Sequence, residues 1–366
     1  MDRSKWEYKK LGDICDKGSS NIAQNKIEDN TGDYALYGAS GYVKGIDFYH
    51  QEQPYIGVVK DGSGVGRVNK YPAKSSLLGT MQYIFPKECC DLGYLLYVLQ
   101  GLHLEKYKTG AAIPHIYFKD YCKCEVPFPS IADQQRIVAE LDCLNEMIAV
   151  KKEQLKEFDK LAQSIFYDMF GDPVSNEKGW EIDSLNGVCD GIGDGLHGTP
   201  QYDDKGEIAF INGNNLIDGK IVITERTQFV NEGEAKKIYV ELNSNTILLS
   251  INGTLGKTAI YNNERIVLGK SACYLRLKNC LNVQFVMALM NTNEFLDFLE
   301  NNSSQSTIKN VGLKAIRNYK MILPPLALQQ QFAEKISAIE AQKELVKQSI
   351  AETQHLLNYT MDKYFG

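Results

Sequence analysis

An internal duplication constrains the fold of this chain more than any other feature of its sequence. Each half opens with a Trp-Glu pair, at Trp6 and at Trp180. Each half closes with a block that begins Pro-x-x-x-x-Gln-Gln, at residues 129–135 and 324–330, and continues at one fixed offset to a final Phe-Gly pair. An internal repeat builds one structural unit per copy. The sequence therefore predicts two equivalent modules, each followed by a segment of fixed length.

The two fixed-length segments, residues 129–171 and 324–366, are predicted to form long helices. Their apolar residues recur at alternating spacings of three and four, as in the seam of a left-handed coiled coil. Ser130 with Asp133 offers a capping box at the first start, and Gly171 supplies a stop. The residues of the expected coiled-coil interface are Ile137, Leu141, Leu144, Ile148, Leu155, Phe158, Ile165, Phe332, Ile336, Ile339, Val346, Ile350 and Leu357. The polar residues that interrupt the two apolar stripes are Lys151, Lys343, Thr353 and Thr360.

A pair of ordinary amphipathic core helices is the alternative interpretation of these segments. We favour the coiled coil because helices of globular domains rarely run this long without a break. Two helices of equal length, each joined to an equivalent module, can pair antiparallel with approximate two-fold symmetry. That symmetry suits a partner which is itself two-fold, such as duplex DNA.

The variable segments that precede the helices, residues 1–128 and 172–323, are rich in Gly, Tyr, Asn and β-branched residues. Such segments are typical of short strands and turns. We therefore predict an α+β fold: two globular domains separated by two long antiparallel coiled-coil helices, with an internal pseudo-two-fold repeat. The predicted strands are Tyr55–Val59, Gln82–Phe85, Ile221–Thr224, Thr246–Ser250 and Tyr274–Leu277, and the predicted module helices are 91–100 and 282–291.

Charge and composition exclude several classes of protein. The formal net charge of −6 argues against a protein that coats nucleic acid indiscriminately, although it leaves room for a local basic surface. Nine cysteines without a CxxC spacing predict buried, reduced thiols and no zinc site. The charged start of the chain and the lack of an apolar run of about 20 residues predict a cytoplasmic protein without a membrane partner.

Two glycine-rich stretches imitate nucleotide-binding motifs without matching them. Residues 253–258 resemble a P-loop, but two residues rather than four separate the glycines. Residues 193–198 fit GxGxxG by letter, but Thr199 and Pro200 follow, so no helix starts there. The five histidines show no ligand spacing. We therefore predict no catalytic residues, no metal site and no cofactor.

A pair of corresponding loops, one in each module, is the best candidate for a binding site. Glycine lets backbone approach a partner closely, and its N–H groups can meet phosphate. Arg and Lys neutralise phosphates or reach guanine, and Asn can pair with adenine. The alternative is a hairpin whose glycines only serve the turn, but recurrence in both modules, with a cation after the last Gly, favours DNA binding. The candidate DNA-binding residues are Lys60, Ser63, Arg67, Asn69, Lys70 and Lys74 in the first module, and Asn252, Thr254, Lys257, Arg265 and Lys270 in the second.

In these features the chain resembles the specificity subunit of a type I restriction-modification system. The resemblance rests on the two Trp-Glu starts, the loops with Gly66-Arg67 and Gly256-Lys257, the two Gln-Gln helix starts, and the segment from Met169 to Pro173. It covers essentially the whole chain. One departure concerns the residue before the first of the two glutamines, usually Glu in the family, because Asp133 and Leu328 stand there.

The resemblance implies a non-catalytic subunit that recognises DNA. Residues 1–128 and 172–323 would be two target recognition domains, each reading one half of a bipartite double-stranded target. The conserved helices at 129–171 and 324–366 would act as a spacer. Two modification (methyltransferase) subunits would bind this subunit, and restriction subunits would join the complex.

Two other functions stay open at this point. The first is an interaction scaffold, with two protein-binding modules on a coiled-coil rod and no nucleic acid. The low net basicity favours this scaffold, whereas the recurrent loop and the family resemblance favour DNA recognition. The second, a stand-alone enzyme, is disfavoured because the sequence contains no recognisable catalytic motif.

Overall fold

The computed structural model describes residues 6–110 and 113–366. It divides into two compact units, one formed by Met1–Lys152 with Lys347–Gly366 and the other by Glu153–Val346. We call these the first and second unit. Both boundaries lie inside long helices, so each unit combines one α+β module with parts of both helices.

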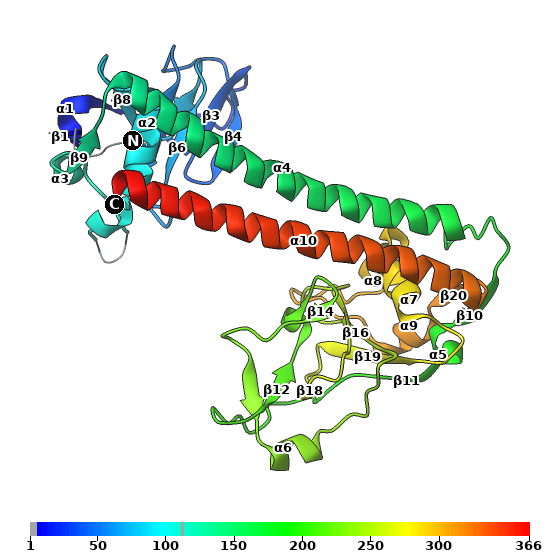
Figure 1. The fold of residues 1–366 in the computed structure, drawn as a ribbon. Helices are drawn as coiled ribbons and strands as arrows, with labels where there is room; N and C mark the ends of the chain where they lie inside the picture. Colours follow the sequence, from blue (N-terminus) through cyan, green and yellow to red (C-terminus); the bar gives the residue numbers. More distant parts are fainter. Residues whose placement is uncertain (1–5, 111–112) are drawn as a thin grey trace. The chain divides into compact units, whose positions relative to one another are not determined.

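The first unit contains a four-stranded antiparallel sheet and a smaller three-stranded sheet (Figure 1). The four-stranded sheet has the order β2 (Cys15–Ser19), β8 (Met81–Pro86), β5 (Tyr55–Val59), β6 (Val68–Tyr71). The smaller sheet has the order β4 (Gly41–Ile46), β3 (Tyr34–Gly38), β7 (Ser76–Leu77), in which β3 and β7 are parallel. The remaining elements are the strand pair β1 (Glu7–Lys10) and β9 (Glu125–Phe128), and the helices α1 (Leu11–Ile14), η2 (Gln24–Lys26), α2 (Leu92–Gly101), η3 (Leu104–Tyr107) and α3 (Phe118–Tyr121).

The second unit repeats these three strand orders and adds one further strand pair. Its four-stranded sheet has the order β11 (Cys189–Gly193), β19 (Ala272–Leu277), β16 (Thr246–Ser250), β17 (Thr258–Ile260). Its three-stranded sheet has the order β15 (Gln228–Val230), β12 (Ile208–Ile211), β18 (Ile266–Leu268), and β12 and β18 are parallel. The other elements are the pairs β10 (Glu181–Ser184) with β20 (Lys320–Leu323) and β13 (Leu216–Ile217) with β14 (Lys220–Ile221), and the helices α5 (Leu185–Val188), η4 (Gly213–Asn215), α6 (Glu232–Lys237), α7 (Val283–Met290), α8 (Asn293–Asn301) and α9 (Leu313–Asn318). The predicted duplication is therefore confirmed in the fold.

The inner strands β5 and β16 are covered on both faces of their sheets. In β5, Ile56 and Val58 join the core that also contains α2, whereas Tyr55 and Val59 join an aromatic cluster on the opposite face. Successive side chains of a strand point to opposite faces, so a strand covered on both sides is apolar throughout. All five residues of β5 and all five of β16 are buried accordingly.

Most of the predicted module elements form. The strands predicted at 55–59 and 246–250 match β5 and β16, and the helices predicted at 91–100 and 282–291 correspond to α2 and α7. The strand predicted at 221–224 is wrong beyond Ile221, where β14 ends. Side chains capture the backbone there: Asn215 Nδ2 donates to the Val222 carbonyl at 3.0 Å, and the Thr224 N–H donates to Thr227 Oγ1 at 2.8 Å. Such local bonds compete with strand pairing.

The two fixed-length segments form helices of 40 residues each, α4 (Ile131–Phe170) and α10 (Leu326–Phe365). The predicted start of α4 is confirmed, because the Asp133 N–H donates to Ser130 Oγ at 3.2 Å. Its predicted stop is confirmed as well. Gly171 follows with a φ of +76°, and its N–H donates to the Tyr167 carbonyl at 2.8 Å.

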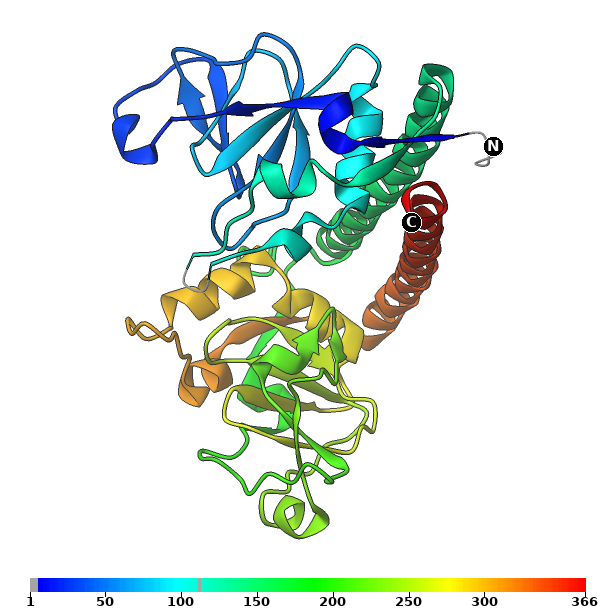
Figure 2. The same cartoon turned by 90° about the vertical axis from the view of Figure 1, so that its left-hand side faces the viewer.

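Within each unit the two long helices pack antiparallel. In the first unit, Tyr364 Oη of α10 donates to Glu140 Oε2 of α4 at 2.5 Å, so the last turns of α10 lie beside the early turns of α4 (Figure 1 and Figure 2). In the second unit, Lys343 Nζ of α10 meets Asp159 Oδ1 of α4 at 2.8 Å. Residue numbers therefore rise along one helix as they fall along the other.

The apolar stripes of these helices serve the module cores as well as the helix pair. Ile137 and Leu141 are fully buried in the core that contains α2, and Phe332 is fully buried in the core that contains α7. Near their first turns, α4 and α10 therefore act as amphipathic core helices of the modules, which was the alternative interpretation. They also pair with one another antiparallel, as the coiled-coil interpretation predicted. Of the other interface residues, Leu144, Ile148, Ile336, Ile339 and Leu357 are buried, and Leu155, Phe158, Ile165, Val346 and Ile350 are partly buried.

The repeated tryptophans attach each module to the end of a long helix. The Trp6 ring stacks on Tyr364, with ring centroids 6.1 Å apart, near the end of α10. Trp180 Nε1 donates to the Phe170 carbonyl at 2.8 Å, at the end of α4. The Trp-Glu signature of the sequence therefore marks where a module receives the end of a helix.

The nine cysteines are unpaired, but the prediction that they are buried is wrong for Cys89, Cys143 and Cys280, which are exposed. Across residues 6–110 and 113–366, no helix combines the length and apolar character needed to cross a bilayer. The same residues contain no cluster of His, Cys, Asp and Glu suited to holding a metal ion.

Candidate nucleic-acid interface

The two candidate loops occupy the same position in the two modules. Residues 60–67 connect β5 to β6, and residues 251–257 connect β16 to β17. In the first loop the Val59 N–H donates to the Arg67 carbonyl at 2.9 Å, and in the second the Ser250 N–H donates to the Lys257 carbonyl at 2.8 Å. Arg67 and Lys257 are therefore structural equivalents, as the sequence repeat indicated.

A second segment crosses each loop in the same way. The Gly62 N–H donates to the Pro114 carbonyl at 2.9 Å, and the Gly253 N–H donates to the Lys309 carbonyl at 2.9 Å. These bonds fix the first residues of each loop against a chain segment far away in sequence. Each loop is thus a constrained hairpin, and its backbone is organised before any partner binds.

The glycines of the loops have two different roles. At Gly66, with a φ of +90°, a Cβ would lie 2.6 Å from the Glu105 nitrogen, and at Gly256, with a φ of +82°, it would lie 2.4 Å from Leu296 Cδ2. These two glycines serve the turn and its packing. Gly62 and Gly253 also have positive φ values, but a Cβ there would meet nothing within 4 Å. Their surroundings are open, so a partner can approach the loop closely here, although both N–H groups are already hydrogen-bonded to the crossing segment.

The cations at the loop tips differ in their partners. Arg67 is exposed and makes a long contact of 3.5 Å from Nη1 to the Ala39 carbonyl. Lys60 is half-buried and lies 3.8 Å from Asp61 Oδ2. Lys257 is half-buried, and none of the described carboxylates lies within 4 Å of its ammonium group. Ser63 and Thr254 are exposed on the same loops.

Most of the candidate residues, but not all, lie on or beside the β5–β6 and β16–β17 loops. Asn252 lies at the start of its loop, where Nδ2 donates to Asn310 Oδ1 at 3.2 Å, and Lys270 is exposed in the turn before β19. Asn69 and Lys70 lie on the exposed edge strand β6.

Two candidates lie away from the loops. Lys74 follows the far end of β6 and lies 3.9 Å from Glu52 Oε1. Arg265 precedes β18, and its guanidinium contacts Glu207 at 2.8 Å and Glu232 at 2.5 Å. Each of these two cations thus has at least one carboxylate close to it.

A hollow of about 650 Å³ adjoins the Arg67 side of the first loop. Its wall includes the turn between β3 and β4, Tyr42 of β4, which exposes 66% of its surface, and Thr80 from the turn before β8. Backbone carbonyls, hydroxyls and an aromatic ring thus surround a space next to an exposed cation. Groups of these kinds recognise the edges of bases.

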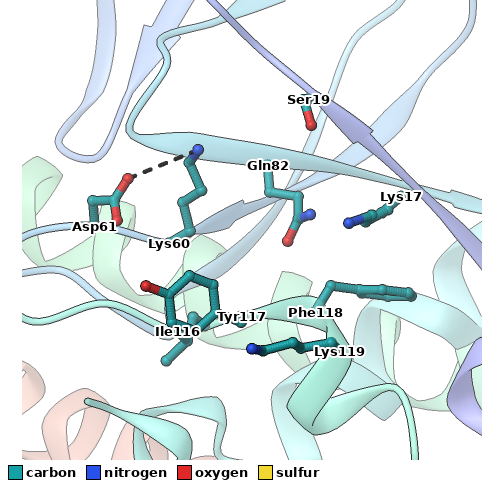
Figure 3. Close-up of a pocket in the computed structure, with 9 residues that line it drawn as sticks. All are labelled: Lys17, Ser19, Lys60, Asp61, Gln82, Ile116, Tyr117, Phe118 and Lys119. Carbon is teal, nitrogen blue, oxygen red and sulfur yellow. Dashed lines mark ion pairs between the residues drawn. The ribbon is translucent and has the colours of Figure 1, made fainter. Parts of the chain in front are cut away.

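Sequence reasoning missed three residues that line a second cavity beside the same loop: Lys17, Gln82 and Lys119. Lys17 and Gln82 lie on the neighbouring strands β2 and β8, and Lys119 comes from α3 (Figure 3). Lys17 alternates with exposed Ser19 on β2, which is the one signal in the sequence that could have indicated a polar face. The pairing of these strands could not be read from the chain.

The buried cysteines of the modules are not activated nucleophiles. Burial raises the pKa values of Cys15, Cys90 and Cys189 to about 12. A thiol with so high a pKa stays protonated near neutral pH, and the thiolate is the nucleophilic form.

Comparison with known proteins identifies a matching family and similar relatives for this chain. The family described as "Type I restriction modification DNA specificity domain" matches residues 3–159 and 177–355. A "Type I restriction enzyme MjaIX specificity subunit" from Methanocaldococcus jannaschii is 25% identical over 276 residues, which are 68% of this chain and 62% of that relative. The matched region thus spans less than two thirds of the curated relative.

Two solved structures share the fold over nearly their full length. The S subunit of a type I restriction-modification system from M. genitalium is 16% identical with a TM-score of 0.59, covering 99% of this chain and 96% of that chain. A chain from a structure on "complex assembly and conformational transition of the type I R-M system" is 18% identical with a TM-score of 0.58, covering 98% and 97%.

Proposed function

The chain belongs to the family of type I restriction modification DNA specificity domains, and from this premise we propose that it is the DNA-recognition subunit of a type I restriction-modification complex. Each module reads one half of a bipartite double-stranded target, and the α4–α10 pair acts as the spacer. We keep the predicted target recognition domains at 1–128 and 172–323 and the predicted helical segments at 129–171 and 324–366.

The duplicated loop edge is the observation that carries this proposal. Two modules with the same strand order present a constrained glycine loop at the same edge of the same sheet, with Arg67 and Lys257 in equivalent positions. A bipartite target needs two such readers, and a cation beside an accessible glycine loop suits a phosphate backbone. Of the candidate residues, we assign DNA contact to those at the loop edges: Lys60, Ser63, Arg67, Asn69, Lys70, Asn252, Thr254, Lys257 and Lys270.

The proposed partners follow from the family. Two modification subunits bind this chain and supply the methyltransferase chemistry, and restriction subunits join the complex in the cytoplasm. The chain itself is not an enzyme in this proposal. The absence of a catalytic motif in the sequence and the protonated state of the buried thiols support this assignment.

Methylation in a host that lacks other methyltransferases tests the proposed function. The chain is co-expressed with its modification subunit, and the methylated sites are read by sequencing the host DNA. We expect a target with two specified parts and an unspecified gap. In a chimeric chain, residues 10–120 are replaced with those of another module, and we expect only one part of the target to change. A continuous target, or a target that the exchange leaves unchanged, would contradict the proposal.

A further inference from the structure

A cavity of about 250 Å³ opens on the first module beside the β5–β6 loop (Figure 3). Gln82, which is 7% exposed, and Ile116, which is 2% exposed, form its buried part. Its polar rim carries three lysines, Lys17, Lys60 and Lys119, and one carboxylate, Asp61. The cavity therefore has an excess of positive charge, in contrast to the net charge of the chain.

Two hydrogen-bond donors face the same space in this cavity without an acceptor. Gln82 Oε1 accepts a hydrogen bond from Tyr121 Oη at 3.1 Å, which turns its amide nitrogen toward the cavity. Figure 3 shows this nitrogen and the Lys17 ammonium pointing toward one another. Within the described part of the chain neither group has a hydrogen-bond or ion-pair partner. Lys17 is exposed and the cavity is open to solvent, so both donors can be reached from outside. Two donors that converge on one accessible space suit an anion between them.

The carboxylate of the rim does not fill this role. Asp61 lies 3.8 Å from Lys60 Nζ, on the other side of the cavity from Lys17 in Figure 3. Lys119 Nζ lies 5.1 Å from the centre of the Tyr117 ring and also has no carboxylate within 4 Å among the described residues. The cavity thus offers donors from three elements, beside the hydroxyls of Ser19 and Tyr117 and the one carboxylate of Asp61. Positive donors outnumber the acceptors, which favours an anionic group over an uncharged base.

The second module shows that the fold itself does not require these polar groups. Strand register places Ile192 where the first module has Lys17, and Cys273 where it has Gln82. The crossing segment places Ile251 at the position of Lys60. All three replacements belong to the apolar core of the second unit. The same fold is therefore built without these polar groups in the second module, and their convergence in the first module is a feature of that module alone that a ligand explains.

From these observations we propose that Lys17, Gln82, Lys60 and Lys119 form a phosphate pocket in the first module only, which holds one phosphate of the DNA backbone. The inference rests on the proposed function, since it places the ligand in the DNA that the loops contact. It adds an asymmetry: the first half of the target is held by a phosphate contact in this pocket that the second half lacks. Such a contact fixes position and contributes no sequence preference.

Affinity for DNA at several salt concentrations tests the pocket in the assembled complex of this chain with its modification subunits. We expect Lys17→Gln to weaken binding several-fold and to lower the slope of log affinity against log salt by about 1. Gln82→Leu removes a donor without removing charge, so we expect weaker binding with an unchanged slope. Lys10→Gln is the matched control, because it removes the same charge from β1, outside the cavity, and we expect no change. Thermal unfolding of each variant shows whether it is folded.

Neutral methylphosphonate links, placed one at a time in the duplex, identify the contacted phosphate. In the wild-type complex we expect one link in the first half-site to weaken binding, and in the Lys17→Gln complex the same link to have no further effect. If every link weakens binding equally in the two complexes, the pocket does not hold a DNA phosphate and the proposal is overturned. The same holds if no single position of the link weakens binding by the wild-type complex. The methylated sequence separates the two proposals. A bipartite target with no effect of these variants refutes the pocket alone, whereas a target that is not bipartite refutes both.

Discussion

Lys151 of α4 donates a hydrogen bond from Nζ to Thr353 Oγ1 of α10 at 2.8 Å. Both residues interrupt the apolar stripes of their helices in the sequence, and the structure shows that they interrupt them at the same place. The Lys151 ammonium also lies 3.4 Å from the Ser349 carbonyl. A polar pair at the seam of two helices selects one register over its neighbours, because any slip leaves a donor without an acceptor.

We expect Thr353→Val to lower the free energy of unfolding of the chain by about 1 kcal/mol, since the variant keeps the shape of the side chain and loses the acceptor. Thr360→Val is the control: Thr360 is also buried on α10 but makes no described hydrogen bond to α4. Denaturant unfolding measures both variants. Equal effects of the two substitutions would show that the Lys151 contact contributes nothing specific.

The first glutamine of each Gln-Gln pair joins the start of a long helix to its module. Gln134 is fully buried; its Oε1 accepts from the Asp91 N–H at 2.9 Å, and its Nε2 donates to the Pro129 carbonyl at 3.0 Å. Gln329 repeats this arrangement with the Asn282 N–H at 2.8 Å and the Pro324 carbonyl at 2.8 Å. The repeated motif thus has a structural cause, the pairing of backbone groups at a helix junction.

We expect Gln134→Leu to destabilise the first unit by about 3 kcal/mol, because the substitution leaves buried backbone groups without partners. The neighbouring residue supplies the control, since Gln135 is exposed and Gln135→Leu should change stability little. Hydrogen exchange of α2 and α4, compared with exchange in the second unit, locates the effect. A loss of protection spread equally over both units would contradict this assignment.

The sequence was most informative where its pattern repeats. The duplicated blocks predicted both 40-residue helices and the equivalence of Arg67 and Lys257, because each prediction relied on two copies and on local spacing. The Lys17–Gln82 cavity could not be predicted, because it depends on which strands pair and on the segment that carries Lys119. The strand predicted at 221–224 failed for a local reason, since side-chain hydrogen bonds from Asn215 and Thr227 replaced it.

Lys343 stabilises the helix pair in a way that is lost at alkaline pH. Partial burial works to lower the pKa of Lys343, but hydrogen bonds to Asp159 and Glu340, both at 2.8 Å, outweigh it and raise the pKa above its usual value of 10.5. A lysine whose pKa is raised by folding stabilises the folded state fully below the pKa of the unfolded chain. This contribution is lost as the pH rises through the higher, folded pKa.

We therefore expect the difference in unfolding free energy between the wild-type chain and Lys343→Met to stay constant from pH 7 to about 10 and to shrink above that. Lys335→Met, an exposed position on the same helix without a described ion pair, should show no such trend. Urea unfolding across this pH range measures both differences. A constant difference for Lys343→Met up to the highest pH would show that the ion pairs do not stabilise the fold.

The loop cations and the carboxylate-paired cations provide a matched test of the proposed interface. Arg67→Ala and Lys257→Ala each remove a cation that has no carboxylate partner among the described residues, so we expect each to weaken DNA binding of the assembled complex and to lower the salt slope by about 1. Lys74→Ala and Arg265→Ala remove cations that already face carboxylates away from the loops, so we expect affinity and slope to change little. Because all four variants lose one positive charge, a general effect of net charge would lower the slope equally in all of them. If the salt slope falls for Arg67→Ala and Lys257→Ala but not for Lys74→Ala and Arg265→Ala, the DNA contacts the loop edges.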